Sequence, residues 1–225
     1  MSARITADHG PKWVQLTLQS PVLELATMEL LAEHLNTLAE RRPAKPLILA
    51  SAHPSIFLAG AHLAEIATLD ATSSGGYAAS GRAVMSRLDM FPSATIAAVA
   101  GSCSGGGFDL VLSCDRIIAG PSATFSHPGV RRGLVTGWGG TTRVPSAMGW
   151  TIARRALLRA SVFGATEAAE MGFATRSTGD VISEAQDLAT RLTGLHTTRI
   201  VNWRHLRNRG WAHGWSADRD PGYNC

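Results

Sequence analysis

Two glycine-bearing loops carry the residues whose types and spacing best suit chemistry. The first is Phe57-Leu-Ala-Gly-Ala-His-Leu63, and the second is Gly105-Gly-Gly107, between an expected strand and an expected helix. Glycine lets the backbone approach a ligand closely because no Cβ stands in the way. The first N–H groups of a helix have no partner within the helix and lie at the positive end of its dipole. Such a helix start, with a second N–H donor from the first loop, suits an oxygen atom on which negative charge develops during a reaction.

The glycine run has other interpretations when it is taken alone. A strand-to-helix turn packed tightly against a neighbour is the purely structural alternative. The spacing of Gly101, Gly105 and Gly107 does not match the dinucleotide-binding fingerprint, and no Lys-Ser or Lys-Thr follows to make a P-loop. Ser102, Cys103 and Ser104 precede the run, and none of them is expected to be a nucleophile.

The apolar pattern predicts alternating strands and helices around these loops. Strands are expected at residues 13–18, 46–50, 95–100 and 116–119, and helices at residues 27–41, 77–89, 108–113, 151–160 and 182–192. This alternation predicts an α/β fold. We find no internal repeat and no linker, so residues 1–193 are expected to form one core. Residues 194–225 differ in composition and are expected to form a short tail, with a role in oligomerisation.

Composition narrows the class of protein. The chain has 225 residues, 45% hydrophobic and 17% charged, which is typical of a globular domain. Its net charge of +4 suits an anionic small molecule but is too weak and dispersed to indicate nucleic-acid binding. The three cysteines match neither a metal motif nor a disulfide framework. With no long apolar stretch at the N-terminus, we expect a reduced cytoplasmic protein without a membrane span.

The longest motif, from Ile96 to Ala119, reads IAAVAGSCSGGGFDLVLSCDRIIA and resembles the signature of the enoyl-CoA hydratase/isomerase (crotonase) superfamily. The segment Phe57-Leu-Ala-Gly-Ala61 is similar to that family's other oxyanion segment. The similarity continues through residues 124–128, 139–143 and 165–172, and it covers roughly residues 10 to 190.

The resemblance implies a crotonase-like (ClpP/crotonase) β-β-α spiral core that assembles as a homotrimer or hexamer. It implies an acyl-CoA thioester substrate, with coenzyme A entering as part of the substrate and with no further cofactor and no metal. By the same resemblance, the N–H groups of Ala61 and Gly106 form an oxyanion hole. The residues that it assigns to substrate and coenzyme A binding are Ala59, Gly60, His62, Leu63 and Gly105.

The carboxylates depart from the family pattern. Asp109 occupies the first acid position, three residues after Gly106 and so on the same helix face. The resemblance implies an acid or base there, whereas the simpler alternative is a charge that favours the first helical turn. Gly129 occupies the second acid position, and Gly137 the position of an Asp in dienoyl isomerases. A two-carboxylate hydratase mechanism is therefore in doubt, and a single carboxylate suits double-bond isomerisation better.

Two histidines are candidates to compensate for the missing acid. His127 lies two residues before Gly129, and His62 follows Ala61; either is a candidate acid or base, and the alternative is a hydrogen-bonded or exposed loop residue. Arg131 and Arg132 fit surface or interface charges better than a substrate clamp. Three functions stay open: a hydratase/isomerase that uses Asp109, an acyl-CoA-binding or scaffold subunit without chemistry, and a decarboxylase or C–C lyase with the same oxyanion hole.

Overall fold

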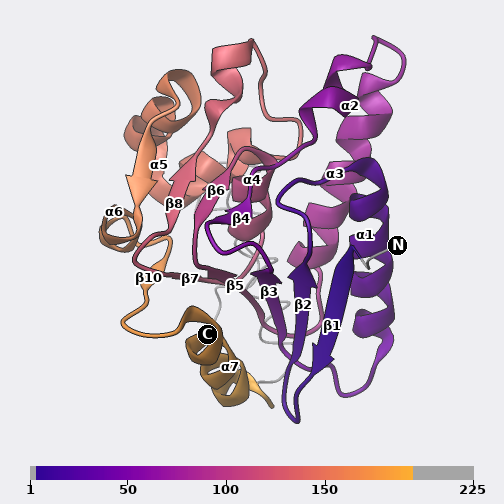
Figure 1. Ribbon diagram of the computed structural model, residues 1–225, viewed down its shortest axis with the longest axis vertical. Helices are drawn as coiled ribbons and strands as arrows, with labels where there is room; N and C mark the ends of the chain where they lie inside the picture. Colours follow the sequence, from indigo (N-terminus) through magenta and orange to yellow (C-terminus); the bar gives the residue numbers. More distant parts are fainter. Residues whose placement is uncertain (1–3, 195–225) are drawn as a thin grey trace, which may run out of the picture.

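Two sheets form the centre of the molecule. The computed structural model describes residues 4–194, and Figure 1 shows the strands side by side between layers of helices. The larger sheet has the order β1-β2-β3-β5-β7-β10 and is parallel except for the β1–β2 pair. Its strands are β1 (Ile5–His9), β2 (Val14–Leu18), β3 (Leu47–Ser51), β5 (Thr95–Val99), β7 (Arg116–Ala119) and β10 (Thr175–Arg176).

The smaller sheet contains the strands that lead into the two predicted functional loops. Its order is β4-β6-β8-β9, with β4 and β8 parallel to β6 and with β9 antiparallel to β8. The strands are β4 (Ile56–Leu58), β6 (Ser102–Ser104), β8 (Thr124–Ser126) and β9 (Val162–Gly164). Because β4 and β6 are parallel neighbours, the loops that follow them leave the sheet at the same edge.

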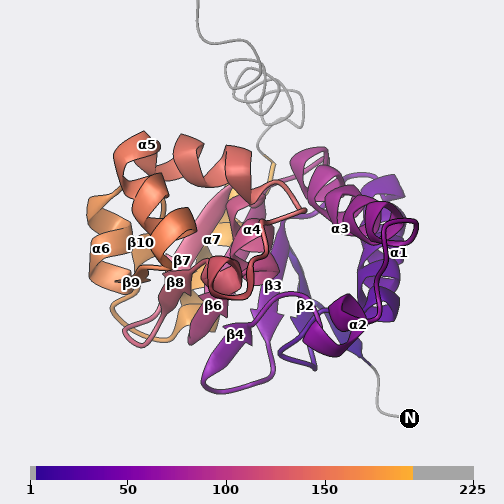
Figure 2. The same cartoon turned by 90° about the horizontal axis from the view of Figure 1, so that it is seen from above.

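Helices cover both faces of the larger sheet. On one side α1 lies beside α3, and on the other α7 packs its buried Val181, Ala185 and Ala189 against the apolar side chains of β3, β5 and β7 (Figures 1 and 2). The helices are α1 (Leu25–Glu40), α2 (Leu63–Ala67), α3 (Ser74–Asp89), α4 (Gly106–Leu112), α5 (Gly140–Arg159), α6 (Ala165–Glu170) and α7 (Val181–Leu192), with a 3₁₀ helix η1 at Pro128–Arg132.

The α/β fold predicted from the sequence is confirmed, and one predicted helix proves to be part of a longer, kinked one. The four predicted strands correspond to β2, β3, β5 and β7, and four of the helices to α1, α3, α4 and α7. The helix predicted at residues 151–160 is only the second half of α5, which begins at Gly140. Gly149 has a φ of 75° and kinks this helix, which interrupts the apolar period.

The described part of the chain ends shortly after α7. Residues 195–225, and so nearly all of the predicted tail, lie outside the described residues. The boundary between core and tail therefore stays a prediction. Within residues 4–194, no helix is both long enough and apolar enough to cross a bilayer.

Candidate active site

The glycine run builds the start of α4. Gly105 has a φ of 55°, which turns the chain from β6 into the helix in a conformation that favours glycine. Gly107 lies so close to β4 that a Cβ on it would fall 2.4 Å from the carbonyl oxygen of Leu58. The two glycines therefore have different roles: one makes the turn, and the other lets the helix pack against the neighbouring strand.

The two predicted loops meet at the first residue of α4. Gly60 has a φ of 91°, and a Cβ on it would lie 2.6 Å from the backbone nitrogen of Gly106. Ala61, the next residue, is thereby brought to the start of the helix. Within residues 4–194, neither the N–H of Ala61 nor that of Gly106 donates to another backbone group. Both residues border the same pocket, so two N–H groups without a backbone acceptor lie beside the space that a ligand would occupy.

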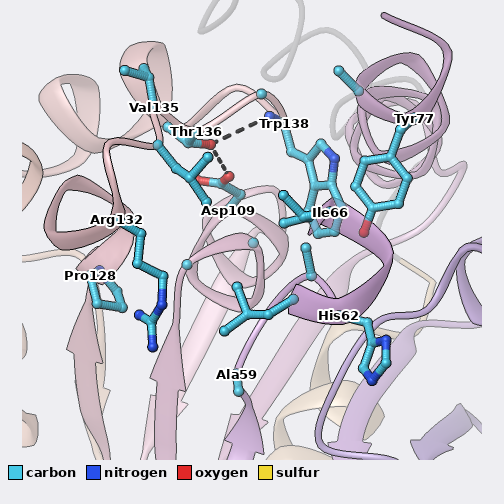
Figure 3. A pocket seen from close by; sticks show the side chains of 18 of the residues that line it. Ala59, His62, Ile66, Tyr77, Asp109, Pro128, Arg132, Val135, Thr136 and Trp138 are labelled. Atoms are coloured by element: carbon cyan, nitrogen blue, oxygen red, sulfur yellow. Dashed lines mark hydrogen bonds between the residues drawn. The ribbon is translucent and has the colours of Figure 1, made fainter. Parts of the chain in front are cut away.

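Asp109 lies one turn into α4, and its carboxylate is held from two sides. Oδ2 accepts a hydrogen bond from the Thr136 hydroxyl (Figure 3). Oδ1 is 2.9 Å from Nε2 of His127. A Cβ on Gly140, the first residue of α5, would fall 2.2 Å from Oδ1. Only 1% of the Asp109 side chain is exposed, against 6% for His127. The starts of two helices favour a negative charge at this position.

A pocket of about 760 Å³ collects almost all of the predicted site residues, a size that suits a small-molecule site. Among its described lining residues, Asp109 supplies the acidic side chain. Gly60 is buried behind the lining. The predicted residues that border the pocket are Ala59, Ala61, His62, Leu63, Gly105, Gly106, Asp109 and His127.

The two candidate histidines have different environments. The structure pairs His127 with Asp109, whereas Figure 3 shows His62 on another side of the pocket, away from that carboxylate. Nδ1 of His62 is buried and has no hydrogen-bond partner among the described residues. Gly129 and Gly137 both border the pocket, so the positions without the family's second acid do face the ligand space.

The loop between η1 and α5 supplies residues that the sequence did not reveal. Thr136 reaches Asp109, and the ring of Trp138 packs against Gly106 and lies 6.0 Å from the ring centre of Tyr77. Arg132, expected as a surface charge, is exposed but also borders the pocket (Figure 3). Nothing near Thr136 in the sequence marks it as a site residue, because its partner lies 27 positions earlier.

Cys103 is unsuited to nucleophilic chemistry. Its side chain is fully buried in β6, and this burial, followed by the negative charge of Asp109, raises the pKa of the thiol well above its usual value. A thiol that stays protonated is a poor nucleophile. The expectation that this residue is not a nucleophile agrees with its position.

Comparison with known proteins identifies a family whose profile spans both glycine-bearing loops and Asp109. The sequence profile described as Enoyl-CoA hydratase/isomerase matches residues 13–203. The chain belongs to this family. The family resemblance of the two loops and of the Ile96–Ala119 segment is thereby confirmed.

Individual relatives agree with the family. A human mitochondrial methylglutaconyl-CoA hydratase is 32% identical over 64% of this chain and 43% of its own length. A probable enoyl-CoA hydratase of Mycobacterium leprae is 32% identical over 73% of this chain and 64% of its own length. The aligned part of this chain is thus less than two thirds of either relative.

Solved structures share the fold. An enoyl-CoA hydratase from Bacillus anthracis superposes with a TM-score of 0.85 at 26% identity, covering 92% of this chain and 83% of that one. Pseudomonas aeruginosa DspI gives a TM-score of 0.87 at 23% identity, covering 93% and 88%, and it shows the fold alone. The crotonase-like architecture is therefore established for residues 4–194.

Proposed function

We propose that this chain is an acyl-CoA enzyme of the enoyl-CoA hydratase/isomerase type, which stabilises a thioester enolate and moves a proton with Asp109. The observation that carries the proposal is one buried carboxylate, Asp109, bordering the same pocket as the free N–H groups of Ala61 and Gly106. Removal of a proton from C2 of the acyl group sends negative charge to the thioester oxygen. Two N–H donors aimed at that oxygen would each contribute about 3 kcal/mol to transition-state stabilisation.

Substrate binding follows from the pocket walls. Ala59, His62, Leu63 and Gly105 border the pocket, and Gly60 fixes the approach of one loop to the other. We assign these residues to the acyl-CoA thioester, with coenzyme A as part of the substrate and no separate cofactor. The acyl-CoA names of the relatives support this substrate class. A homotrimer or hexamer in the cytoplasm stays a prediction.

Within this family type, the pocket favours isomerisation over hydration. Hydration by two acids needs a second carboxylate to hold water, and the described lining offers Asp109 alone, with Gly129 and Gly137 at the other two positions. Isomerisation needs one group that takes a proton from C2 and returns it to C4. Asp109 suits that task.

Steady-state assays with 3-enoyl-CoA and 2-enoyl-CoA series test the proposal. The wild-type chain should convert 3-enoyl to 2-enoyl thioesters faster than it hydrates 2-enoyl thioesters. Asp109→Asn should lower kcat about 100-fold or more, because it removes the acid–base group, while acyl-CoA affinity measured by calorimetry changes little. Unchanged turnover in this variant would contradict the assigned role.

The empty acid positions at Gly129 and Gly137 also favour two other candidates. One is an acyl-CoA-binding or scaffold subunit, for which calorimetry would show tight acyl-CoA binding while no thioester turns over. The other is a decarboxylase or C–C lyase, since an enolate formed by loss of CO₂ or by C–C cleavage requires no second acid. A product screen with malonyl-type thioesters identifies that activity.

A further inference from the structure

Three separate segments enclose the Asp109 carboxylate. His127, at the entry to η1, meets Oδ1 at 2.9 Å, and Thr136, in the loop after η1, donates its hydroxyl to Oδ2. Gly140, at the start of α5, closes the side next to Oδ1 with bare backbone, and a Cβ on it would also fall 2.9 Å from Nε2 of His127. We use the term carboxylate clamp for His127, Thr136 and Gly140.

The clamp defines which hydrogen bonds Asp109 can still make. A carboxylate has about four acceptor positions. Oδ2 accepts from the Thr136 hydroxyl and Oδ1 meets Nε2 of His127, so about half of these positions are occupied. For His127 to donate to an ionised Asp109, its Nε2 must carry the hydrogen, a requirement met by the imidazolium and by one neutral tautomer. With 1% of the side chain exposed, the remaining positions have little access to solvent.

We infer that His127 and Thr136 are positioning residues that hold Asp109 so that it passes one and the same proton between two carbons of the acyl chain without exchange with water. The inference rests on the proposed function and deepens it. It assigns the pocket to intramolecular proton transfer, which a carboxylate held in place and shielded from solvent favours over water activation.

The transfer conserves every atom and electron. The C2–H bond of a 3-enoyl thioester breaks, its proton passes to the Asp109 carboxylate, and its electron pair forms a dienolate whose charge lies on the thioester oxygen. The same proton then bonds to C4, and the double bond moves to C2=C3. No electron acceptor is required and no water is consumed. The N–H groups of Ala61 and Gly106 bind the thioester oxygen. His127 and Thr136 hold the Asp109 carboxylate in one orientation while the proton passes from C2 to C4.

The charged and titratable groups around the clamp are few. Cys103 of β6 is close enough for the Asp109 charge to raise the pKa of its thiol, and it stays protonated. Arg132 borders the pocket and His62 lies on another side of it. The described neighbours therefore offer no second carboxylate as an alternative proton store.

Isotope transfer tests the inference directly. A 3-enoyl-CoA that carries deuterium at C2 is turned over in ordinary water, and mass spectrometry with NMR gives the fraction of label found at C4 of the product. The wild-type enzyme should retain most of the transferred label. His127→Ala and Thr136→Val should lower the retained fraction at least threefold, with acyl-CoA affinity changed less than threefold.

Conservative variants separate positioning from simple folding. His127→Gln and Thr136→Ser keep a donor at the same place and should restore retention toward the wild-type value. His9→Ala on exposed β1 and Thr142→Val on the exposed face of α5 are matched controls that should leave retention unchanged. If an Ala or Val variant does not fold, as judged by circular dichroism, the Gln and Ser variants must still retain label.

The outcomes distinguish the inference from the proposed function. No turnover of any enoyl-CoA by the wild-type chain would overturn the proposed function. Wild-type turnover with the label lost to water would overturn the inference alone. Undiminished retention in both His127→Ala and Thr136→Val, or a loss of retention in His127→Gln and Thr136→Ser equal to theirs, would also overturn it.

Discussion

The indole ring of Trp138 lies directly on the backbone of Gly106. A Cβ on this glycine would fall 2.1 Å from Cζ3 and 2.2 Å from Cε3 of the ring. Trp138 is itself buried, and its ring is tilted against that of Tyr77. An aromatic wall therefore stands beside the helix start that we assign to the thioester oxygen, and it leaves no room for a side chain there.

Gly106→Ala should displace Trp138 and impair turnover. The overlap with a rigid ring is expected to cost about 1–3 kcal/mol of unfolding free energy, typical of an overpacked core, and to change the tryptophan fluorescence. Urea unfolding and steady-state kinetics measure both effects. Gly76→Ala is the matched control, because a Cβ at that exposed position of α3 meets nothing within 4 Å. The control should keep its activity and gain about 0.5–1 kcal/mol from helix propensity.

Gly60→Ala should separate the two donor loops. Its φ of 91° is unfavourable for alanine, and the new Cβ would lie 2.6 Å from the Gly106 nitrogen. If the two N–H groups act together, kcat should fall by about 100-fold or more, as it does when one oxyanion donor is lost. Binding of a saturated acyl-CoA should weaken far less. A variant with normal kcat would show that the convergence of the loops is not needed for catalysis.

Arg143→Met should loosen the loop that carries Thr136 and Trp138. Arg143 forms an ion pair with Asp89 of α3 and donates to the Trp138 carbonyl oxygen at 3.2 Å. Both charged side chains are mostly buried, so loss of one is expected to cost about 3 kcal/mol in denaturant unfolding. Arg154→Met, on the exposed side of the same helix, is the control and should change stability by less than about 0.5 kcal/mol.

Tyr77 should ionise late and make stability fall at high pH. Burial, followed by the negative charge of Glu65, raises the pKa of Tyr77 from 10.0 to about 12. The unfolded chain loses this proton first, so the free energy of unfolding should decrease as pH rises from about 10 toward 12. Below about pH 10 the contribution is fully present. Absorbance titration at alkaline pH should lose its latest step in Tyr77→Phe, and unfolding of that variant should be less sensitive to pH in this range.

Much of the fold follows from local patterns in the sequence. Met28, Leu31, Leu35 and Leu38 recur at helical spacing and form the buried face of α1. The apolar run of β5 is buried along its whole length, as expected of a central parallel strand. By contrast, β4, β6, β8 and β9 have three residues each, too few to show a period.

The first half of α5 shows why other parts could not be predicted. Gly140, Pro145 and Gly149 are poor helix formers, and Pro145 lacks the N–H for a helical hydrogen bond. Buried Val144 and Met148 nevertheless anchor this segment in the main core. Tertiary packing thus outweighs local preference there, and information about distant contacts is absent from a local pattern.

In the candidate site, too, some residues could be located from the sequence, whereas their contacts could not. Ala61, Gly106 and Asp109 could be located because a family motif surrounds each of them. The contacts of Asp109 with His127 and Thr136 span 18 and 27 positions and exist only after the chain has folded. The sequence makes His127 and His62 candidates by residue type and by their positions near Gly129 and Ala61, but only the structure shows that His127 lies beside the carboxylate.

Because Gly140 packs against Asp109, the solvent exposure of this carboxylate depends on the position of the start of α5. Since bare backbone closes one side of the carboxylate, outward motion of the helix start would admit solvent before the acyl pocket itself is lost. As temperature rises, the transferred proton should therefore begin to exchange with solvent before turnover is lost.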